Sequence, residues 1–382
     1  MRRLVLAYSI VGVVGQACGE GGPQPAGGVS FAQVSAGLDH ACGVTTSGAA
    51  YCWGANGGGG LGDGTTTSPR TSPVLVLGGL RLIQVAAGSG QTCAVSTARA
   101  AYCWGYNGDG DLGDGTTIDR TSPVPVVGGL SFTQVTAAGD GYSCAVTTGH
   151  AAYCWGLNVS GNLGDGTTTQ QTSPVLVLGG LSFSQVSARD DYHACGVTTG
   201  GAAYCWGYNV EGQLGDGTTT RQTSPVPVTG GLSFVQLSAG DVRSCAVTTS
   251  GAAYCWGYNV NGWLGDGTTT TPRTSPVPVV GGVTFAQVSA ASNYTCGLAA
   301  GGAAYCWGHN GDGQLGDGST TDRTSPVPVV GGLTFTEVSA TASSTCGLAT
   351  GGAVYCWGYN GDGRLGDGTT NSSSVPVRVV VQ

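Results

Sequence analysis

Cysteine is the residue whose type and spacing carry the clearest chemistry in this chain. Fourteen of its 15 cysteines form seven pairs, each with nine residues between the two members and a turn midway. The two cysteines of a pair therefore face each other across a hairpin, which predicts seven disulfides in an exported protein. In the chain-entropy model, each disulfide that closes such a short loop stabilises the fold by about 2.5 to 3 kcal/mol. The expected pairs are Cys42 with Cys52, Cys93 with Cys103, Cys144 with Cys154, Cys195 with Cys205, Cys245 with Cys255, Cys296 with Cys306 and Cys346 with Cys356.

Metal binding is the alternative chemistry for these cysteines. Zinc sites bring four ligands together, commonly with C-x2-C-type spacing, whereas these pairs are separated along the chain. We therefore expect no metal and no other cofactor.

The remaining cysteine, Cys18, follows an export signal. Residues 1–3 are basic at two positions, residues 4–14 are apolar, and small residues precede Cys18, which together predict a signal peptide over residues 1–17. The apolar run is shorter than the ~20 residues that a membrane-spanning helix needs. Cleavage before Cys18 makes it the first residue and the site of a bacterial lipid anchor, although Gly15 stands where a lipobox usually has Leu or Val. Ordinary cleavage is the alternative.

These features set the expected location of the chain. Residues 18–28 are rich in Gly and Pro and are expected to form a flexible tether. We expect an outer-membrane or cell-surface lipoprotein, and otherwise a secreted or periplasmic protein. Contact with a membrane is expected only through the lipid anchor.

Other chemistry-bearing residues give no catalytic set. The four histidines share no motif with a nucleophile, and neither G-x-S-x-G nor H-E-x-x-H occurs. A Gly-Asp-Gly triplet recurs and is interpreted as a turn whose carboxylate accepts nearby backbone N–H groups. Residues 107–111 resemble the start of a calcium loop, but Leu112 and Ile118 replace the Gly and Glu that such a loop requires. We therefore expect a protein without enzymatic activity.

The elements that position the cysteines are repeated. Tyr-Cys-Trp-Gly begins at Tyr51 and returns six times, and successive tryptophans are spaced 50 or 51 positions apart. Such a period indicates a solenoid, a propeller or an array. Each copy contains four short β-prone runs bounded by Gly, Asn, Asp and Ser, represented by Ser131 to Val135, 144–148, 151–155 and Pro123 to Val127. No helical periodicity of useful length is present, so the chain is predicted to be all-β.

Seven four-stranded units predict a seven-bladed β-propeller over residues 29–382. The Pro-Val-Pro-Val-Val run is expected at an edge, since proline cannot donate to a ladder, and Gly128-Gly129 is expected to make a short hairpin. The first strand, Val29 to Val34, and the last, Val375 to Val380, are expected to pair and close the ring. An open solenoid is the alternative, but it requires capping repeats that the sequence lacks. We expect a monomer.

The repeat F-x-x-V-x-x-G-x-x-x-x-C-x-V-T-x-x-G-x-x-Y-C-W-G-x-N-x-x-G-x-L-G resembles that of the regulator of chromosome condensation family, whose members form seven-bladed propellers. The resemblance covers residues 29–382 and implies guanine-nucleotide exchange in some members and binding scaffolds or inhibitors in others. The cysteine pairs resemble those of exported bacterial members. Exchange factors of the family are nuclear or cytosolic and use a wedge-like insertion, and no unit here carries an insertion.

Positions that vary among the copies indicate where binding could differ. One set lies two residues before each first cysteine and is expected to form a ring on one face, with neutral variation of exposed loop residues as the alternative. Its members are His40, Gln91, Tyr142, His193, Arg243, Tyr294 and Ser344. A second set follows each tryptophan by seven residues, and its only large apolar member, Trp263, is the best anchor candidate. Its members are Gly60, Asp111, Asn162, Gln213, Trp263, Gln314 and Arg364.

Charge narrows the class of partner. The formal net charge is −8, and all 13 basic residues are Arg. Without a basic face the chain cannot offset phosphate repulsion, so nucleic acid is not an expected partner. We expect a propeller that binds a protein or a glycan through one face. The alternatives are an exchange-factor-like regulator of a GTPase and an envelope enzyme without a recognisable motif.

Overall fold

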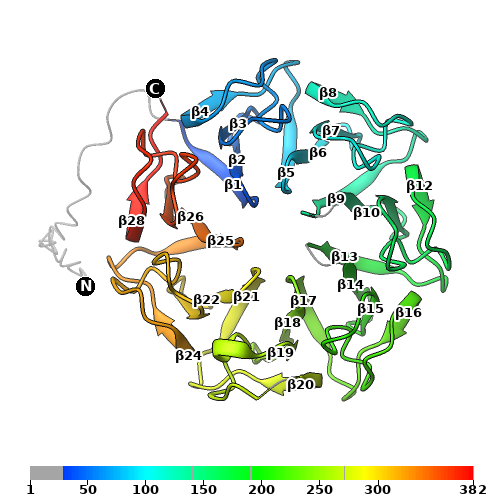
Figure 1. The fold of residues 1–382 in the computed structure, drawn as a ribbon, viewed down its shortest axis with the longest axis vertical. Helices are drawn as coiled ribbons and strands as arrows, with labels where there is room; N and C mark the ends of the chain where they lie inside the picture. Colours follow the sequence, from blue (N-terminus) through cyan, green and yellow to red (C-terminus); the bar gives the residue numbers. More distant parts are fainter. Residues whose placement is uncertain (1–28, 140, 190–191, 271, 382) are drawn as a thin grey trace, which may run out of the picture.

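The chain forms a closed ring of seven blades around a central axis (Figure 1). The computed structural model describes residues 29–139, 141–189, 192–270 and 272–381. Each blade is a four-stranded antiparallel sheet whose strands follow one another in sequence from the axis outward. Blade 1 contains β1 to β4, and each later blade takes the next four strands, so that blade 7 contains β25 to β28. The predicted all-β, seven-bladed propeller with four strands per blade is confirmed.

Equivalent strands have nearly identical bounds in all blades. The innermost strands are β1 (Phe31–Ala36), β5 (Leu82–Ala87), β9 (Phe132–Ala137), β13 (Phe183–Ala188), β17 (Phe234–Ala239), β21 (Phe285–Ala290) and β25 (Phe335–Ala340). The second strands are β2 (His40–Thr45), β6 (Gln91–Ser96), β10 (Tyr142–Thr147), β14 (His193–Thr198), β18 (Arg243–Thr248), β22 (Tyr294–Ala299) and β26 (Ser344–Ala349). The third strands are β3 (Ala50–Gly54), β7 (Ala101–Gly105), β11 (Ala152–Gly156), β15 (Ala203–Gly207), β19 (Ala253–Gly257), β23 (Ala304–Gly308) and β27 (Val354–Gly358). The outer strands are β4 (Arg70–Leu75), β8 (Arg120–Pro125), β12 (Gln171–Leu176), β16 (Gln222–Pro227), β20 (Arg273–Pro278), β24 (Arg323–Pro328) and β28 (Ser373–Arg378). A single 3-10 turn, η1 (Val260–Gly262), follows β19.

The position of each strand follows from its sequence. Second strands are buried on both faces, because neighbouring blades cover them on either side. The proline-containing runs form the outer edges, as predicted, since proline has no N–H to donate. Gly128 and Gly129 connect β8 to β9 of the next blade instead of forming a hairpin, because these two strands lie in different sheets.

All seven predicted disulfides are present. Each joins directly opposite residues of a second and a third strand, as Cys144 and Cys154 do in blade 3. Their sulfur atoms lie in the hydrophobic layers between blades, where every paired cysteine is fully buried. The disulfides therefore join strands within a blade and also fill the core.

The predicted strand pairing between Val29 to Val34 and Val375 to Val380 is wrong. Among the described residues β1 pairs with β2 and β28 pairs with β27, so each blade is built from a single repeat. Both terminal strands already have a partner within their own repeat, and closure therefore needs no exchange of strands. The ring closes where blade 7 packs against blade 1, with Phe31, Trp53 and Leu348 in one apolar cluster. The Phe31 N–H also donates to the Gly352 carbonyl over 2.9 Å.

The axis carries a ring of amide side chains that joins neighbouring inner strands. In a typical pair, Gln84 Nε2 donates to the Val135 carbonyl (2.8 Å) and the Val135 N–H donates to Gln84 Oε1 (2.9 Å). Blade 7 has Glu337 at this position, and its Oε2 accepts the Val34 N–H over 3.0 Å. Burial raises the pKa of the Glu337 carboxyl to about 7, although hydrogen bonds from Val34 and Gln33 oppose the shift. At this position of the ring around the axis, the closing seam thus has a titratable carboxyl group where the other seams have an amide.

Candidate functional site

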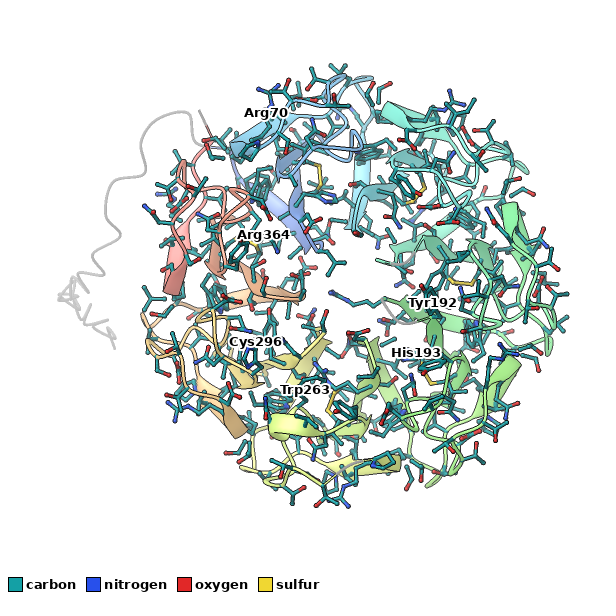
Figure 2. The ribbon with its side chains drawn as sticks, in the orientation of Figure 1. Arg70, Tyr192, His193, Trp263, Cys296 and Arg364 are labelled. Atoms are coloured by element: carbon teal, nitrogen blue, oxygen red, sulfur yellow. A yellow bond between two sulfur atoms is a disulfide. The ribbon has the colours of Figure 1, made fainter. Side chains whose placement is uncertain are left out.

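The first variable ring is buried between blades. Each of its seven residues begins a second strand, and their exposed fractions are 0–2%. The expectation that they form an exposed ring on one face is therefore wrong, and Figure 2 shows His193 within the body of the propeller. The side chain of the first residue of a second strand points into the seam with the next blade, where different polar partners meet it.

Two histidines show how this buried ring works. His40 Nε2 is hydrogen-bonded to Thr92 Oγ1 (2.7 Å) and His193 Nε2 to Ser244 Oγ (3.0 Å), in each case across a blade boundary. Burial lowers the pKa of His40 to about 4 and that of His193 to about 3. Both imidazoles are therefore neutral at neutral pH, and each holds two blades together.

Arg243 also links two neighbouring blades, and its side chain is charged. It is fully buried, its Nη1 donates to the Ser292 carbonyl (3.0 Å), and its Nη2 donates to the Tyr294 carbonyl. Burial lowers the pKa of the guanidinium to about 9. Its Cζ lies 5.2 Å from the centre of the Trp263 ring, and Tyr258 packs edge-on against the same ring. Trp263 is half-buried by these contacts, so the predicted anchor is partly covered by its own protein.

The second variable ring also serves the blade boundaries, through its backbone. The carbonyl of Gly60 accepts the Trp104 indole N–H (2.9 Å) and the Thr92 hydroxyl (2.8 Å) from the next blade. The equivalent indole bond occurs at five further boundaries. Because the backbone carbonyl accepts these hydrogen bonds, the side chain at this position can vary without breaking them.

The Gly-Asp-Gly aspartates are turn residues, as predicted. The Thr65 N–H donates to Asp63 Oδ1 (3.0 Å), Asn56 Nδ2 to the same oxygen (3.2 Å), and Arg70 forms an ion pair with Oδ2 (3.0 Å). Burial raises the pKa of Asp63, but these hydrogen bonds outweigh it and hold the pKa below its usual range. Among the described residues no three His, Cys, Asp or Glu side chains are grouped to hold a metal.

A third ring, which sequence reasoning missed, lies on the accessible face. It follows each tryptophan by two residues, and each of its backbone N–H groups donates to the loop between the first and second strands, as Tyr106 N does to the Gly90 carbonyl (3.0 Å). We call this side of the propeller the loop face. Tyr106 is 44% exposed and Tyr359 37%. The members are Ala55, Tyr106, Leu157, Tyr208, Tyr258, His309 and Tyr359. The sequence signal that could have indicated this ring is that the residue directly after the invariant Gly of Tyr-Cys-Trp-Gly varies among the copies and is mostly aromatic.

The loop face is hollowed over blades 1 to 4 by a groove made of two adjoining cavities. The larger, of about 410 Å³, is lined by Gly58, Ser89, Gly90, Gln91, Tyr106, Asp109, Gly139, Gly141, Leu157 and Tyr192. The other, of about 290 Å³, shares Gly58, Ser89 and Gly90 and extends to Asp39 and Ala55. Ligand pockets typically measure ~300–1,000 Å³, so the groove is large enough to bind a ligand.

Glycines keep this groove open. A Cβ atom on Gly90 would lie 3.2 Å from Tyr106 Cβ, one on Gly60 would lie 2.8 Å from the Gly90 carbonyl oxygen, and one on Gly141 would lie 2.9 Å from Asp109 Oδ2. Side chains at these positions would fill the space or displace its walls. The four consecutive glycines at 57–60 occur in blade 1 alone among the seven copies.

The expected signal peptide, the tether and the acylated Cys18 lie outside the described residues. Within the described part, no helix has both the length and the apolar character to cross a bilayer. The seven disulfides indicate an oxidising, extracytoplasmic environment, because cytosolic thiols are kept reduced.

Comparison with family models identifies the chain. The model described as RCC1-like domain matches residues 16–295, more than half of the sequence. The chain belongs to the RCC1-like domain family. Models of the regulator of chromosome condensation (RCC1) repeat match the remaining C-terminal part, over residues 301–348 and 351–381.

Relatives of this RCC1-like chain include much larger proteins. It is 30% identical over 207 residues to the human probable E3 ubiquitin-protein ligase HERC4, a match that covers 53% of this chain and 20% of HERC4. It is 33% identical over 206 residues to the human E3 ubiquitin-protein ligase HERC2, covering 52% of this chain and 4% of HERC2. The chain thus matches a fifth or less of the length of these relatives.

Solved structures share the fold of the RCC1-like chain. Human WBSCR16 superposes with a TM-score of 0.79 at 20% identity, covering 87% of this chain and 94% of that one. Yeast RCC1 (Prp20), solved bound to Kap60, gives a TM-score of 0.76 at 20% identity and covers 92% of this chain and 85% of its own. At this identity the likeness shows the fold alone.

Proposed function

We propose that this RCC1-like propeller is an extracytoplasmic binding module that recognises a protein partner through its loop face and catalyses no reaction. The observation that carries the proposal is the third ring, which is mostly aromatic and includes the exposed Tyr106 and Tyr359. Aromatic side chains supply large contact areas at low entropic cost and are enriched at interfaces. Yeast Prp20, of the same fold, is described as binding Gsp1p and histones, which is a precedent for protein partners.

The histidines support a module without catalysis. His40 and His193 are buried, neutral and bonded across blade boundaries, so neither is available to a substrate. His150 and His309 do not share a site, since His150 lies at the turn between β10 and β11 and is hydrogen-bonded to the Phe183 carbonyl. His309 belongs to the third ring and is bonded to Asp322 (3.1 Å).

The exchange activity that the family resemblance implies is the alternative. It would require a GTPase in the same compartment, whereas the seven disulfides favour an oxidising one. The seven repeats also keep a spacing of 50 or 51 residues and leave no room for a wedge-like insertion.

A cross-linking experiment tests the proposed face. A photoreactive residue placed at Tyr208 or Tyr359 on the loop face is compared with one at Thr46 or Thr249, exposed residues on the opposite face. The proposal expects one protein to be captured from the native envelope by the loop-face variants and lost when Tyr208 and Tyr359 are both replaced by Ser. Capture of the same protein from Thr46 or Thr249 with equal yield would contradict it.

We also propose that the chain is exported and acylated at Cys18. The extracytoplasmic environment indicated by the disulfides and the lack of a partner for Cys18 in the cysteine pattern support this. Cys18→Ser should move the protein from the membrane to the soluble fraction. Unchanged membrane fractionation of Cys18→Ser would favour simple secretion.

A further inference from the structure

The groove over blades 1 to 4 carries carboxylates on its wall. Asp39 and Asp109 line it, and the lining residues include no Arg. None of the ion pairs among the described residues involves Asp109, whereas Asp39 and Asp362 both pair with Arg364. Within the described part of the chain, Asp109 is therefore a carboxylate on the groove wall that forms no ion pair.

A second carboxyl group stands behind Asp109. Asp111 is fully buried, its Oδ1 accepts the Asp109 N–H (3.2 Å), and its Oδ2 has no hydrogen-bond donor among the described residues. Burial raises the pKa of Asp111 to about 7, and the charge of Asp109 adds to the shift. Burial and then Asp109, Asp111 and Asp119 raise the pKa of the neighbouring Tyr106. These groups respond to the same local field, which is negative at this end of the groove.

The aromatic wall supplies the other half of a cation site. Tyr106 is 44% exposed and lines the same cavity as Asp109, with Leu157 and Tyr192 completing the wall. A cation placed against a tyrosine ring is attracted to the negative face of the ring, more strongly where the cation is desolvated. A carboxylate without a partner beside the ring adds a favourable charge interaction for the same cation.

The shape of the groove suits an extended chain. The two cavities adjoin along Gly58, Ser89 and Gly90, so the space is elongated and passes from blade 1 to blade 4. Glycine-lined walls allow another backbone to approach closely. Extended peptides are recognised by their main chain, with specificity from pockets for individual side chains.

We propose that the groove bounded by Gly58, Gly90, Tyr106 and Asp109 binds an extended segment of the partner protein and holds a Lys or Arg side chain of that segment between Tyr106 and Asp109. This proposal rests on the proposed function, because it names the segment through which the partner docks on the loop face. The carboxylate accepts hydrogen bonds from the cation, and the tyrosine ring covers its apolar stem. No covalent step is involved.

The test uses the full chain with its disulfides intact and a capped five-residue alanine peptide with Lys at its centre. The reference peptide has Gln in place of Lys, and a trimer of N-acetylglucosamine represents a glycan ligand. Binding is followed by NMR titration of backbone amides. We expect the Lys peptide to bind about tenfold more tightly than the Gln peptide and to shift the amides of Tyr106 and Gly90.

The repeat supplies a matched control variant. Asp109→Asn and Tyr106→Ala should each weaken the Lys peptide about tenfold, whereas Asp312→Asn alters the repeat position of Asp109 outside the groove and should leave the affinity within about twofold. Unchanged thermal midpoints of the three variants would confirm that each is folded. Rescue of binding by Tyr106→Phe, which keeps the ring, would separate the ring from its hydroxyl.

Three results would overturn the proposal: no peptide binding, equal binding of the Lys and Gln peptides, or binding of the N-acetylglucosamine trimer in the groove in place of the peptide. The cross-linking at Tyr208 and Tyr359 separates this failure from a failure of the proposed function. If the partner is still captured there while the Lys peptide does not bind, the loop face is the docking surface but the groove does not hold a cation.

Discussion

Two parts of the loop face are built from the same repeat positions but have different surfaces. We call the part with the groove the groove side and the part over blades 5 to 7 the filled side. Over blades 1 to 4, glycines at 57–60 and Gly90 leave a groove with Asp109 on its wall, and this carboxylate forms no ion pair among the described residues. Over blades 5 to 7 the position of Gly60 is taken by Trp263, Gln314 and Arg364. Trp263 packs against Arg243 and Tyr258, and the Arg364 guanidinium lies 5.0 Å from the centre of the Tyr359 ring while pairing with two aspartates.

This difference shows how a rigid repeat acquires an asymmetric surface. The backbone at these positions holds the blades together through its carbonyl groups, as at Gly60 and Asp111, and so the side chains can vary without loss of the fold. Where these side chains are large, they fill the face, and Arg364 pairs with two aspartates there. Where they are absent, a negatively charged groove remains.

The largest expected effect on stability comes from a substitution in the filled side. Arg243→Ala removes donors from the buried carbonyls of Ser292 and Tyr294 and uncovers Trp263, so it should lower the free energy of unfolding by roughly 3 to 5 kcal/mol. Arg221→Ala, which removes an exposed arginine, is the control. Denaturant unfolding with the disulfides intact measures both variants. Equal stability of the two would mean that Arg243 does not hold the filled side together.

The border between the two sides offers a smaller, pH-dependent effect. Glu337 occupies the seam between blades 7 and 1, and burial raises its pKa to about 7. The folded state therefore binds the proton more tightly than the unfolded chain, so stability falls as the pH rises from about 4.5 to 7. Glu337→Gln makes this seam like the other six and should stabilise the protein by on the order of 2 kcal/mol at pH 8. It should have little effect at pH 4.5.

Thermal unfolding between pH 4.5 and 8 measures this seam. The matched control is Gln287→Glu, which places the same carboxyl group in the neighbouring seam and should introduce the same pH dependence there. A stabilisation by Glu337→Gln that does not change with pH would contradict the account of the seam. His40 and His193 oppose the trend, since their lowered pKa values mean that stability is lost as the pH falls below about 6.5.

The sequence was sufficient to predict the blades, but it was not sufficient to predict how they meet or what surfaces they form. The cysteine spacing and the Tyr-Cys-Trp-Gly repeat predicted the hairpins, the disulfides and the number of blades, because each depends on neighbours within one copy. Ring closure depends on contacts between the two ends, and there the prediction failed: β28 already has a partner in β27, so the ring closes by packing.

The first variable ring was misplaced for a related reason. Variation at positions such as His40 and His193 suggested exposure, but these side chains enter seams where Thr92 or Ser244 supplies a partner suited to each. The groove could not be predicted either, because it requires glycines from the loops of three blades to meet.

The most direct test of the account fills the groove. Gly58 lines both cavities, and a Cβ there would lie 3.3 Å from Tyr106, a tight but adjustable contact; the same repeat position carries Asp in blades 2, 6 and 7. Gly58→Trp is compared with Asp312→Trp, which adds the same side chain at the equivalent exposed position of blade 6. The account predicts that Gly58→Trp abolishes capture of the partner and binding of the Lys peptide while Asp312→Trp retains both. Undiminished binding by a folded Gly58→Trp protein would contradict it.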